Sequence, residues 1–189
     1  MRVSREQASR NRELILECAA RLFRERGFEG VGVDAVMREA GLTHGGFYGH
    51  FENKQDLIAQ ASALALTTSL HQWKRQGVAA LIDTYLSPKH VSNPGRGCLL
   101  AALGGELGRQ SARVQQAVSP ILEEMLEWLG EGDRERGICR YASLVGALVL
   151  ARNLPAEILA PVRRQLRTNL PDRSAAQSEP SPETPADSR

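Results

Sequence analysis

The sequence has little of the material from which secreted scaffolds, metal centres and membrane proteins are built. Its 189 residues include only three cysteines, Cys18, Cys98 and Cys139, whose wide separation fits neither a disulfide framework nor a metal-binding motif. The longest apolar stretch, residues 142–151, is much shorter than the roughly 20 residues that cross a bilayer, and no signal-peptide pattern is present. We therefore expect a cytoplasmic protein with no membrane partner and no metal.

Patterns that support catalysis are also missing. The four histidines, His44, His50, His71 and His90, do not have zinc-protease spacing. No glycine-rich phosphate loop follows a strand pattern, and no serine lies in a nucleophile motif. The sequence therefore predicts no catalytic residues, no cofactor and no enzymatic activity.

Charge and hydrophobicity allow an ordinary core with local basic regions. The net charge is only +2 and 42% of the residues are hydrophobic, so the chain can form at most two small domains and is not a polycation. Near the N-terminus, Arg2, Arg5, Arg10 and Arg12 are opposed only by Glu6. This segment is either an arm that lies along DNA or a solvated chain end.

An amphipathic helix is predicted in the first 30 residues. Ser4, with Gln7 three residues later, or Ser9 can begin it, and Gly27 can end it. Its apolar residues recur every three or four positions and so share one side of the helix: Ile15, Cys18, Ala19, Leu22 and Phe23.

Two shorter helices are predicted next, joined by a tight turn. The first covers residues 33–40 and is followed by Gly41, which suits the turn. Thr43 is a good N-cap for the second, an α-helix at residues 44–50. At 1.5 Å per residue this helix would be about 10 Å long, which fits the roughly 12 Å width of the major groove of B-DNA.

The helix at residues 44–50 has two unlike faces. Phe47 and Phe51, four residues apart, are expected to pack on the preceding helices. The other face carries His44 and Tyr48 beside glycines, each of which weakens a helix by about 1 kcal/mol relative to alanine. One interpretation is a weak loop. The one we favour is a helix whose missing side chains let its backbone approach phosphates and base edges.

Lys54 follows Asn53, the expected N-cap of the next helix. A cation in the first turn of a helix is unfavourable unless an anion binds there, since helix N-termini attract anions. Lys54 either pairs with a phosphate or points into solvent.

Two segments, LFRERGFEGVGV at residues 22–33 and AGLTHGGFYGHFENKQDL at residues 40–57, resemble the TetR-like family of bacterial transcriptional regulators. The most specific part runs from Gly46 to Lys54. It consists of a small residue, an aromatic residue, tyrosine, any residue, histidine and a second aromatic residue, with a lysine three positions after the second aromatic residue. The resemblance covers about the first third of the chain. It implies a helix-turn-helix repressor that binds a palindromic operator in double-stranded DNA as a homodimer and is released by a small, partly apolar inducer.

The resemblance also implies roles for individual residues. Phosphate contacts are implied for Thr43, Tyr48 and Lys54, proximity to the bases for His44, Gly45 and Gly46, and a position at the backbone or groove edge for His50. The chain departs from the family at Gly32, where a threonine or serine hydroxyl often contacts DNA. With so few side chains available, His44, the N-terminal arm and DNA shape are expected to supply much of the specificity.

The whole chain is predicted to be all-α, with about nine helices. We expect a DNA-binding domain at residues 9–69, with its motif at residues 32–51, and a ligand-binding and dimerisation domain at residues 70–170. Residues 171–189, which are rich in proline, serine and acidic residues, are predicted to be a disordered tail.

Prolines predict local breaks in the second domain. Residues 87–97 contain two prolines and two glycines and are expected to form a loop. Pro120 is expected to kink or split its helix, whereas Pro155 suits the first turn of a last helix at residues 155–170.

A ligand cavity is expected among the helices of the second domain. Its candidate lining residues are apolar, so ordinary core packing explains each of them at least as well. They are Leu99, Leu103, Leu107, Leu122, Met125, Leu126 and Trp128.

The helix around residues 144–150 is apolar on nearly every side, which a second subunit would explain. We predict a two-fold dimer in which this helix and the last one form a four-helix bundle; a central helix in a monomer is the alternative. The predicted interface residues are Leu144, Val145, Leu148, Ile158, Val162 and Leu166.

Two other functions fit parts of the sequence. Cys98 lies two residues after Arg96, and a nearby cation lowers a thiol pKa, so a thiol- or electrophile-responsive regulator is one alternative. A packed, inert cysteine explains the same residue. The other alternative is a helical protein-interaction module, which would not show salt-dependent DNA binding.

Overall fold

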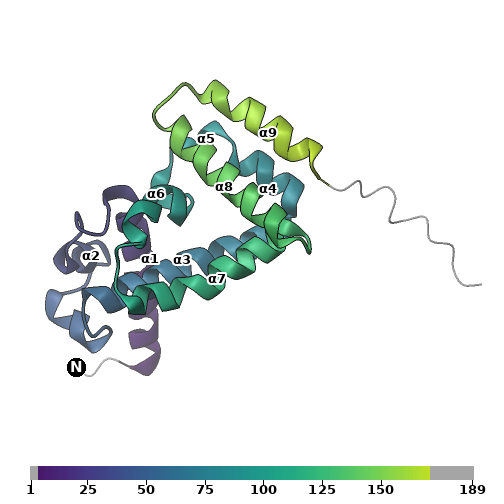
Figure 1. The fold of residues 1–189 in the computed structure, drawn as a ribbon. Helices are drawn as coiled ribbons and strands as arrows, with labels where there is room; N and C mark the ends of the chain where they lie inside the picture. Colours follow the sequence, from purple (N-terminus) through teal and green to yellow (C-terminus); the bar gives the residue numbers. More distant parts are fainter. Residues whose placement is uncertain (1–3, 171–189) are drawn as a thin grey trace, which may run out of the picture.

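The computed structural model describes residues 4–170, and every regular element in this range is helical (Figure 1). The predicted all-α fold is confirmed. The long helices are α1 (Arg5–Arg26), α3 (Lys54–Gln76), α7 (Ala112–Gly130) and α8 (Arg134–Ala151). The shorter elements are α2 (Val33–Glu39), η1 (His44–Gly49), α4 (Val78–Tyr85), α5 (Pro88–Val91), η2 (Pro94–Arg96), α6 (Leu99–Leu107), η3 (Ala156–Ile158) and α9 (Leu159–Thr168).

Two parallel helices, α3 and α7, lie side by side through the middle of the molecule (Figure 1). Arg113 pairs with Asp56 where both helices begin, and Lys74 pairs with Glu124 farther along both. One end of α3 carries the small helical cluster of α1, α2 and η1, and the other end leads into α4, α8 and α9. The long helix α3 therefore connects the two halves of the chain.

Local capping rules account for the main helix boundaries. Ser4, rather than Ser9, begins α1, since its Oγ accepts a hydrogen bond from the Gln7 amide at 3.1 Å. Gly27 ends α1 at φ 79°, a backbone conformation that favours glycine. Asn53 begins α3 by accepting a hydrogen bond from the Asp56 amide at 2.9 Å.

The predicted breaks in the second half differ from the structure. The expected loop at residues 87–97 contains two short helices, because Ser87 caps α5 and prolines occupy the first turn of both elements. Pro120 does not split α7, which packs against α3 and α8. The last predicted helix consists of a 3-10 turn, η3, followed by α9.

Two features are absent from the described part of the chain, a membrane-spanning helix and a metal-binding cluster. Within residues 4–170, no helix is both long enough and apolar enough to cross a membrane. In that range, no group of three histidine, cysteine or acidic side chains is arranged to hold a metal ion. The predicted tail at residues 171–189 lies outside the described residues.

Candidate nucleic-acid interface

Two buried aromatic rings hold η1 against the rest of the N-terminal cluster. Phe47 is only 1% exposed and stacks on Phe51, with 5.5 Å between the ring centroids. The turn before η1 is fixed by a hydrogen bond of 2.9 Å from the Leu42 amide to the Met37 carbonyl. The inward packing predicted for the two phenylalanines is therefore seen.

The opposite face of η1 is open to solvent. Tyr48 is 68% exposed, an unusual position for a large aromatic side chain, and Thr43 and His44 are exposed beside it. A Cβ atom added to Gly45 or Gly49 would meet no atom of the described chain within 4 Å. The element thus presents backbone with almost no side-chain cover, while contact of this face with DNA stays a prediction.

The segment is a 3-10 helix rather than the predicted α-helix. Hydrogen bonds three residues apart join the Gly46 amide to the Thr43 carbonyl at 3.0 Å and the His50 amide to the Phe47 carbonyl at 2.9 Å. A 3-10 helix rises about 2.0 Å per residue and is narrower than an α-helix. Weak α-helical propensity at three glycines is the physical reason for the difference, and the narrower element still suits a groove.

His44 has a partner that the sequence did not reveal. Its Nδ1 lies within ion-pair distance of Asp34 Oδ1 in the first turn of α2, and both side chains are largely exposed. With the Nδ1 proton directed at Asp34, a neutral ring presents Nε2 as an acceptor, and a charged ring presents Nε2 as a donor. While this contact is in place, Nε2 is the ring nitrogen left open to solvent.

The other predicted contact residues lie beside this face. His50 is half-buried, with its ring tilted against Phe51. Lys54 is half-buried in the first turn of α3, and no carboxylate within residues 4–170 forms an ion pair with it. Its charge is therefore available for an external anion.

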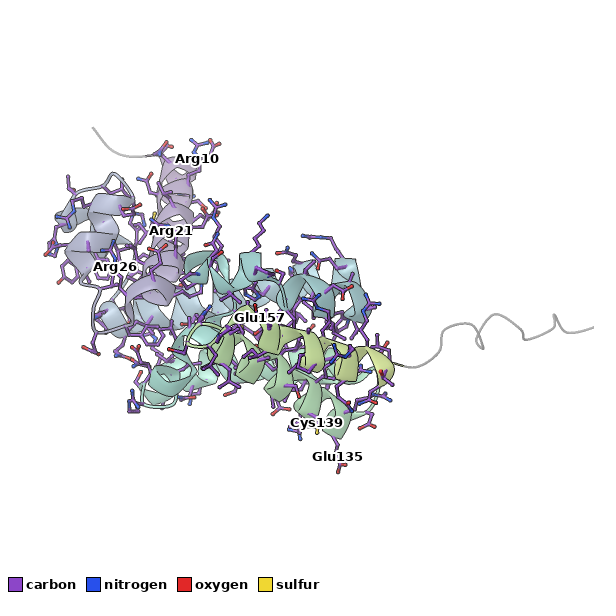
Figure 2. The ribbon with its side chains drawn as sticks, turned by 90° about the horizontal axis from the view of Figure 1, so that it is seen from above. Arg10, Arg21, Arg26, Glu135, Cys139 and Glu157 are labelled. Atoms are coloured by element: carbon purple, nitrogen blue, oxygen red, sulfur yellow. The ribbon has the colours of Figure 1, made fainter. Side chains whose placement is uncertain are left out.

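The basic N-terminal segment is helical from Arg5 onward. Figure 2 shows Arg10 near the free end of α1, where it pairs with Glu6 at 2.7 Å. Arg12 bonds to Gln60 and lies 5.1 Å from the centroid of the Phe51 ring. These two arginines are thus engaged within the chain, which weakens the interpretation of a free arm.

Residues 15–61, which span most of α1 to the first turns of α3, match the family described as bacterial regulatory proteins, tetR family. The HTH-type transcriptional repressor BepR of Brucella suis is 32% identical over 131 residues, which are 69% of this chain and 58% of BepR. The chain is TetR-like, with a TetR-family DNA-binding domain at its N-terminal end. An HTH-type transcriptional regulator of Staphylococcus aureus is 35% identical over 71 residues, 38% of each protein.

Solved structures agree on the fold beyond the matched segment. A TetR transcriptional regulator from Chloroflexus aurantiacus superposes with a TM-score of 0.72 at 23% identity, covering 86% of this chain and 95% of that one. This TetR-like chain nevertheless spans less than two thirds of the curated relatives named above, 38% and 58% of their lengths.

Salt bridges and hydrogen bonds tie the DNA-binding half of this TetR-like chain to the other half. Arg113 of α7 pairs with Asp56 at 2.7 Å, next to the start of α3. Glu106 of α6 accepts a hydrogen bond of 2.8 Å from the Phe28 amide, in the turn after α1. These contacts connect α6 and α7 directly to residues beside the helix-turn-helix.

The seven residues predicted to line a ligand cavity lie within or beside the core. Leu99, Leu103, Leu107 and Met125 are buried, and Leu122, Leu126 and Trp128 are half-buried. None of them lines the cavity of about 420 Å³ beside α1 or the cavity of about 230 Å³ beside α4. Their role as ligand contacts stays a prediction.

A buried polar cluster, which sequence reasoning missed, lies against Met125. Tyr141 donates a hydrogen bond to Met125 Sδ at 3.7 Å and also lies 3.7 Å from Cys98 Sγ. Burial raises the pKa of Tyr85 and of Tyr141 well above the ordinary value, so both stay neutral. These tyrosines are far apart in sequence and show no common motif.

Cys98 itself is a packed residue. Its side chain is buried beside Tyr141, and its amide donates a hydrogen bond of 3.0 Å to His90 Nε2. A thiol that reacts with oxidants is usually accessible to solvent. The structure therefore favours the inert interpretation over a thiol sensor.

The predicted dimer residues divide into two groups. Leu144 and Leu148 are 0% exposed and belong to the core of the single chain, and Leu166 is also buried; these three positions require a correction. Val145, Ile158 and Val162 are half-buried. The error arises because α8 is apolar on two sides, and periodicity cannot say which side faces the chain itself.

The side of α8 that the chain leaves open carries a different apolar stripe. Val149 and Leu150 are 41% and 54% exposed, and Ile138 is exposed on the same helix. Figure 2 shows the neighbouring Cys139 and Glu135 at the outer edge of the molecule. These exposed apolar side chains lie on the side of α8 that the single chain leaves uncovered.

Proposed function

We propose that the chain is a transcriptional repressor that binds a palindromic operator as a homodimer and leaves it when a small, partly apolar ligand binds. The observation that carries the proposal is the exposed face of η1, where Tyr48 projects from nearly bare backbone supported by buried Phe47. Residues 9–69 would form the DNA-binding domain and residues 70–170 the ligand-binding and dimerisation domain, with the boundary inside α3.

Dimerisation would involve α8 and α9. The stripe of Ile138, Val149 and Leu150 would be covered by its two-fold copy, with Val145 at its edge. Two recognition elements related by a two-fold axis would contact half-sites about 34–36 Å apart, or a multiple of that distance. This pairing compensates for the few side chains that a single η1 offers.

Release by a ligand is supported by buried hydrogen-bond donors in the second half. The Nε and Nη2 atoms of Arg152 are buried and have no hydrogen-bond partner within residues 4–170. Buried donors without partners cost about 1–3 kcal/mol each, so a ligand with acceptor atoms would be stabilised there. The apolar residues around Met125 would contact the rest of such a ligand.

The test is to select DNA with the purified protein from a random duplex library and sequence what it retains. We expect an enriched palindrome whose affinity falls by orders of magnitude between about 50 and 200 mM salt. Tyr48→Ala should weaken binding to every sequence, since Tyr48 is assigned to phosphate rather than base contact. A library that stays unenriched, with binding insensitive to salt, would favour a protein-interaction module instead.

A further inference from the structure

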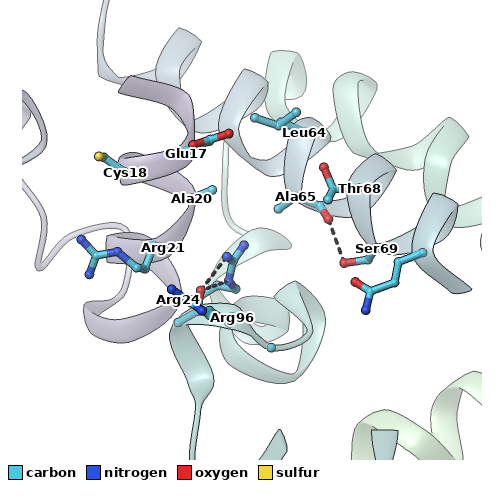
Figure 3. Close-up of a pocket in the computed structure, with 13 residues that line it drawn as sticks. Glu17, Cys18, Ala20, Arg21, Arg24, Leu64, Ala65, Thr68, Ser69 and Arg96 are labelled. Carbon is cyan, nitrogen blue, oxygen red and sulfur yellow. Dashed lines mark hydrogen bonds between the residues drawn. The ribbon is translucent and has the colours of Figure 1, made fainter. Parts of the chain in front are cut away.

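A cavity of about 420 Å³ lies where α1, α3 and η2 meet (Figure 3). Its volume is within the range of small-molecule sites, about 300–1,000 Å³. One wall comes from the DNA-binding half through α1, and another comes from the second half through residues 95–97. It is separate from the buried cluster around Met125, which contributes nothing to its lining.

Positive charge dominates the cavity wall. Arg21, Arg24 and Arg96 line it, against one carboxylate, Glu17. Arg21 is occupied by Glu25 and Glu39, whereas no carboxylate in the described range forms an ion pair with Arg24 or Arg96. Two guanidinium groups at one cavity therefore lack a bound counter-charge.

The missing counter-charge is clearest at Arg24. Its Nε and Nη2 donate hydrogen bonds of 2.9 and 2.6 Å to the Gly95 carbonyl, drawn as dashed lines in Figure 3. A carbonyl satisfies the donors but does not neutralise the charge. Burial lowers the pKa of Arg24, although nearby Glu25 opposes this effect. An anion in the cavity would stabilise the charged form.

The remaining wall suits a ligand with a polar end and an apolar end. Thr68 and Gln72 offer polar atoms, whereas Ala20, Leu64 and Ala65 form an apolar patch. Burial, followed by the charge of Glu39, raises the pKa of the Cys18 thiol. Cys18 thus stays neutral and adds no negative charge that would repel an anion.

We propose that this cavity binds a small organic carboxylate, with the carboxylate at Arg96 and Arg24 and a short apolar group against Ala20, Leu64 and Ala65. Arginine guanidinium groups match the two oxygens of a carboxylate in a fork geometry, which favours a carboxylate over a neutral polar group. The site is distinct from the inducer site around Met125.

Such a ligand would connect the two halves of the chain. Arg24 belongs to α1 and Arg96 to η2, so a bridging carboxylate fixes their separation in addition to the Arg24–Gly95 hydrogen bonds. This regulatory consequence, unlike binding itself, rests on the proposed function. Through this bridge, the orientation of the helix-turn-helix would depend on whether an organic anion is bound.

The test measures binding without DNA, so its failure is distinguishable from failure of the repressor proposal. Protein labelled at alanine and leucine methyl groups is titrated with acetate, benzoate and 4-phenylbutyrate, and in parallel with benzyl alcohol. Each compound is added up to about 10 mM, a concentration that fills about nine-tenths of a site whose Kd is about 1 mM. We expect the methyl signals of Ala20, Leu64 and Ala65 to shift with at least one aromatic carboxylate and not with the alcohol.

Variants of Arg96 test the charge contact. The Arg96 side chain is exposed and makes no hydrogen bond within the described chain, and the bond of its backbone amide to the Asn93 carbonyl does not depend on the side chain, so Arg96→Gln should fold normally. We expect it to weaken carboxylate binding about tenfold or more, because it removes a charge-assisted hydrogen bond, and Arg96→Lys to weaken it less. The matched control is Arg109→Gln, an exposed arginine that does not line the cavity and should bind as wild type does.

Three results would overturn the proposal. They are no methyl shift with any of the carboxylates, equal shifts with benzoate and benzyl alcohol, and unchanged affinity in Arg96→Gln. If binding is seen, adding the same carboxylate to the complex with selected DNA should change the operator affinity of the wild type but not of Arg96→Gln.

Discussion

Replacing Gly49 with alanine should stabilise the protein while weakening its hold on DNA. An added Cβ at this position meets no atom within 4 Å, and the φ angle of Gly49 is not positive. Alanine is favoured over glycine in helical backbone by about 0.5–1 kcal/mol, mainly because glycine loses more conformational freedom on folding. The free energy of unfolding should therefore rise by a similar amount.

The expected loss of DNA affinity follows from the same geometry. If the backbone of η1 lies against a phosphate or a base edge, the methyl group occupies space that the duplex needs. A loss of about 1.4 kcal/mol of binding free energy at one half-site lowers the affinity tenfold, so a dimer with two changed subunits should bind the operator about a hundredfold more weakly. Fluorescence anisotropy with the selected duplex at fixed salt, together with urea unfolding, measures both effects.

The matched control is Gly104→Ala in α6. Gly104 is also exposed and also has no atom within 4 Å of an added Cβ, but it lies away from η1. It should gain stability without losing DNA affinity. Wild-type affinity in Gly49→Ala would refute the close approach of the bare face to DNA.

Four other perturbations test separate parts of the account. Lys54→Ala should reduce the slope of log affinity against log salt by about one for each subunit. His44→Ala should cost about 1–3 kcal/mol at one base position of the selected site and relax the preference there, as binding to single-base variants would reveal. Val149→Asp should produce a monomer by light scattering, whereas Ala79→Asp, on exposed α4 surface, should not. Burial lowers the pKa of His90, so the unfolded chain binds a proton first and the free energy of unfolding should fall as pH drops below about 6.5, with a smaller fall in His90→Gln.

Features that depend on neighbouring residues in the sequence were predictable. Ser4 and Asn53 cap their helices through hydrogen bonds that span three residues, which is a local rule. The four-residue spacing of Phe47 and Phe51 correctly indicated the buried side of the recognition segment. The family motif added the helix-turn-helix, which local patterns alone suggested only as two helices and a turn.

Features that depend on the assembled fold were not predictable. The contact between His44 and Asp34 is set by the angle between α2 and η1, and no periodicity reports that angle. Periodicity also gave Leu144 and Leu148 the wrong side of α8, because the apolar stripe with Val149 has the same period. The cavity between α1, α3 and η2 is lined by polar and apolar residues from three distant segments, so it has no signature in the sequence.

The backbone amides of Gly45, Gly46 and Gly49 provide the most direct test that η1 binds DNA through its bare face. In a nitrogen–proton correlation spectrum, a DNA duplex is added stepwise to the labelled protein at low salt. These three amide signals should shift or broaden, while those of Gly104 and Gly105 on α6 should not. Unchanged signals from η1 together with changes elsewhere would contradict the account, since the duplex would then bind another surface.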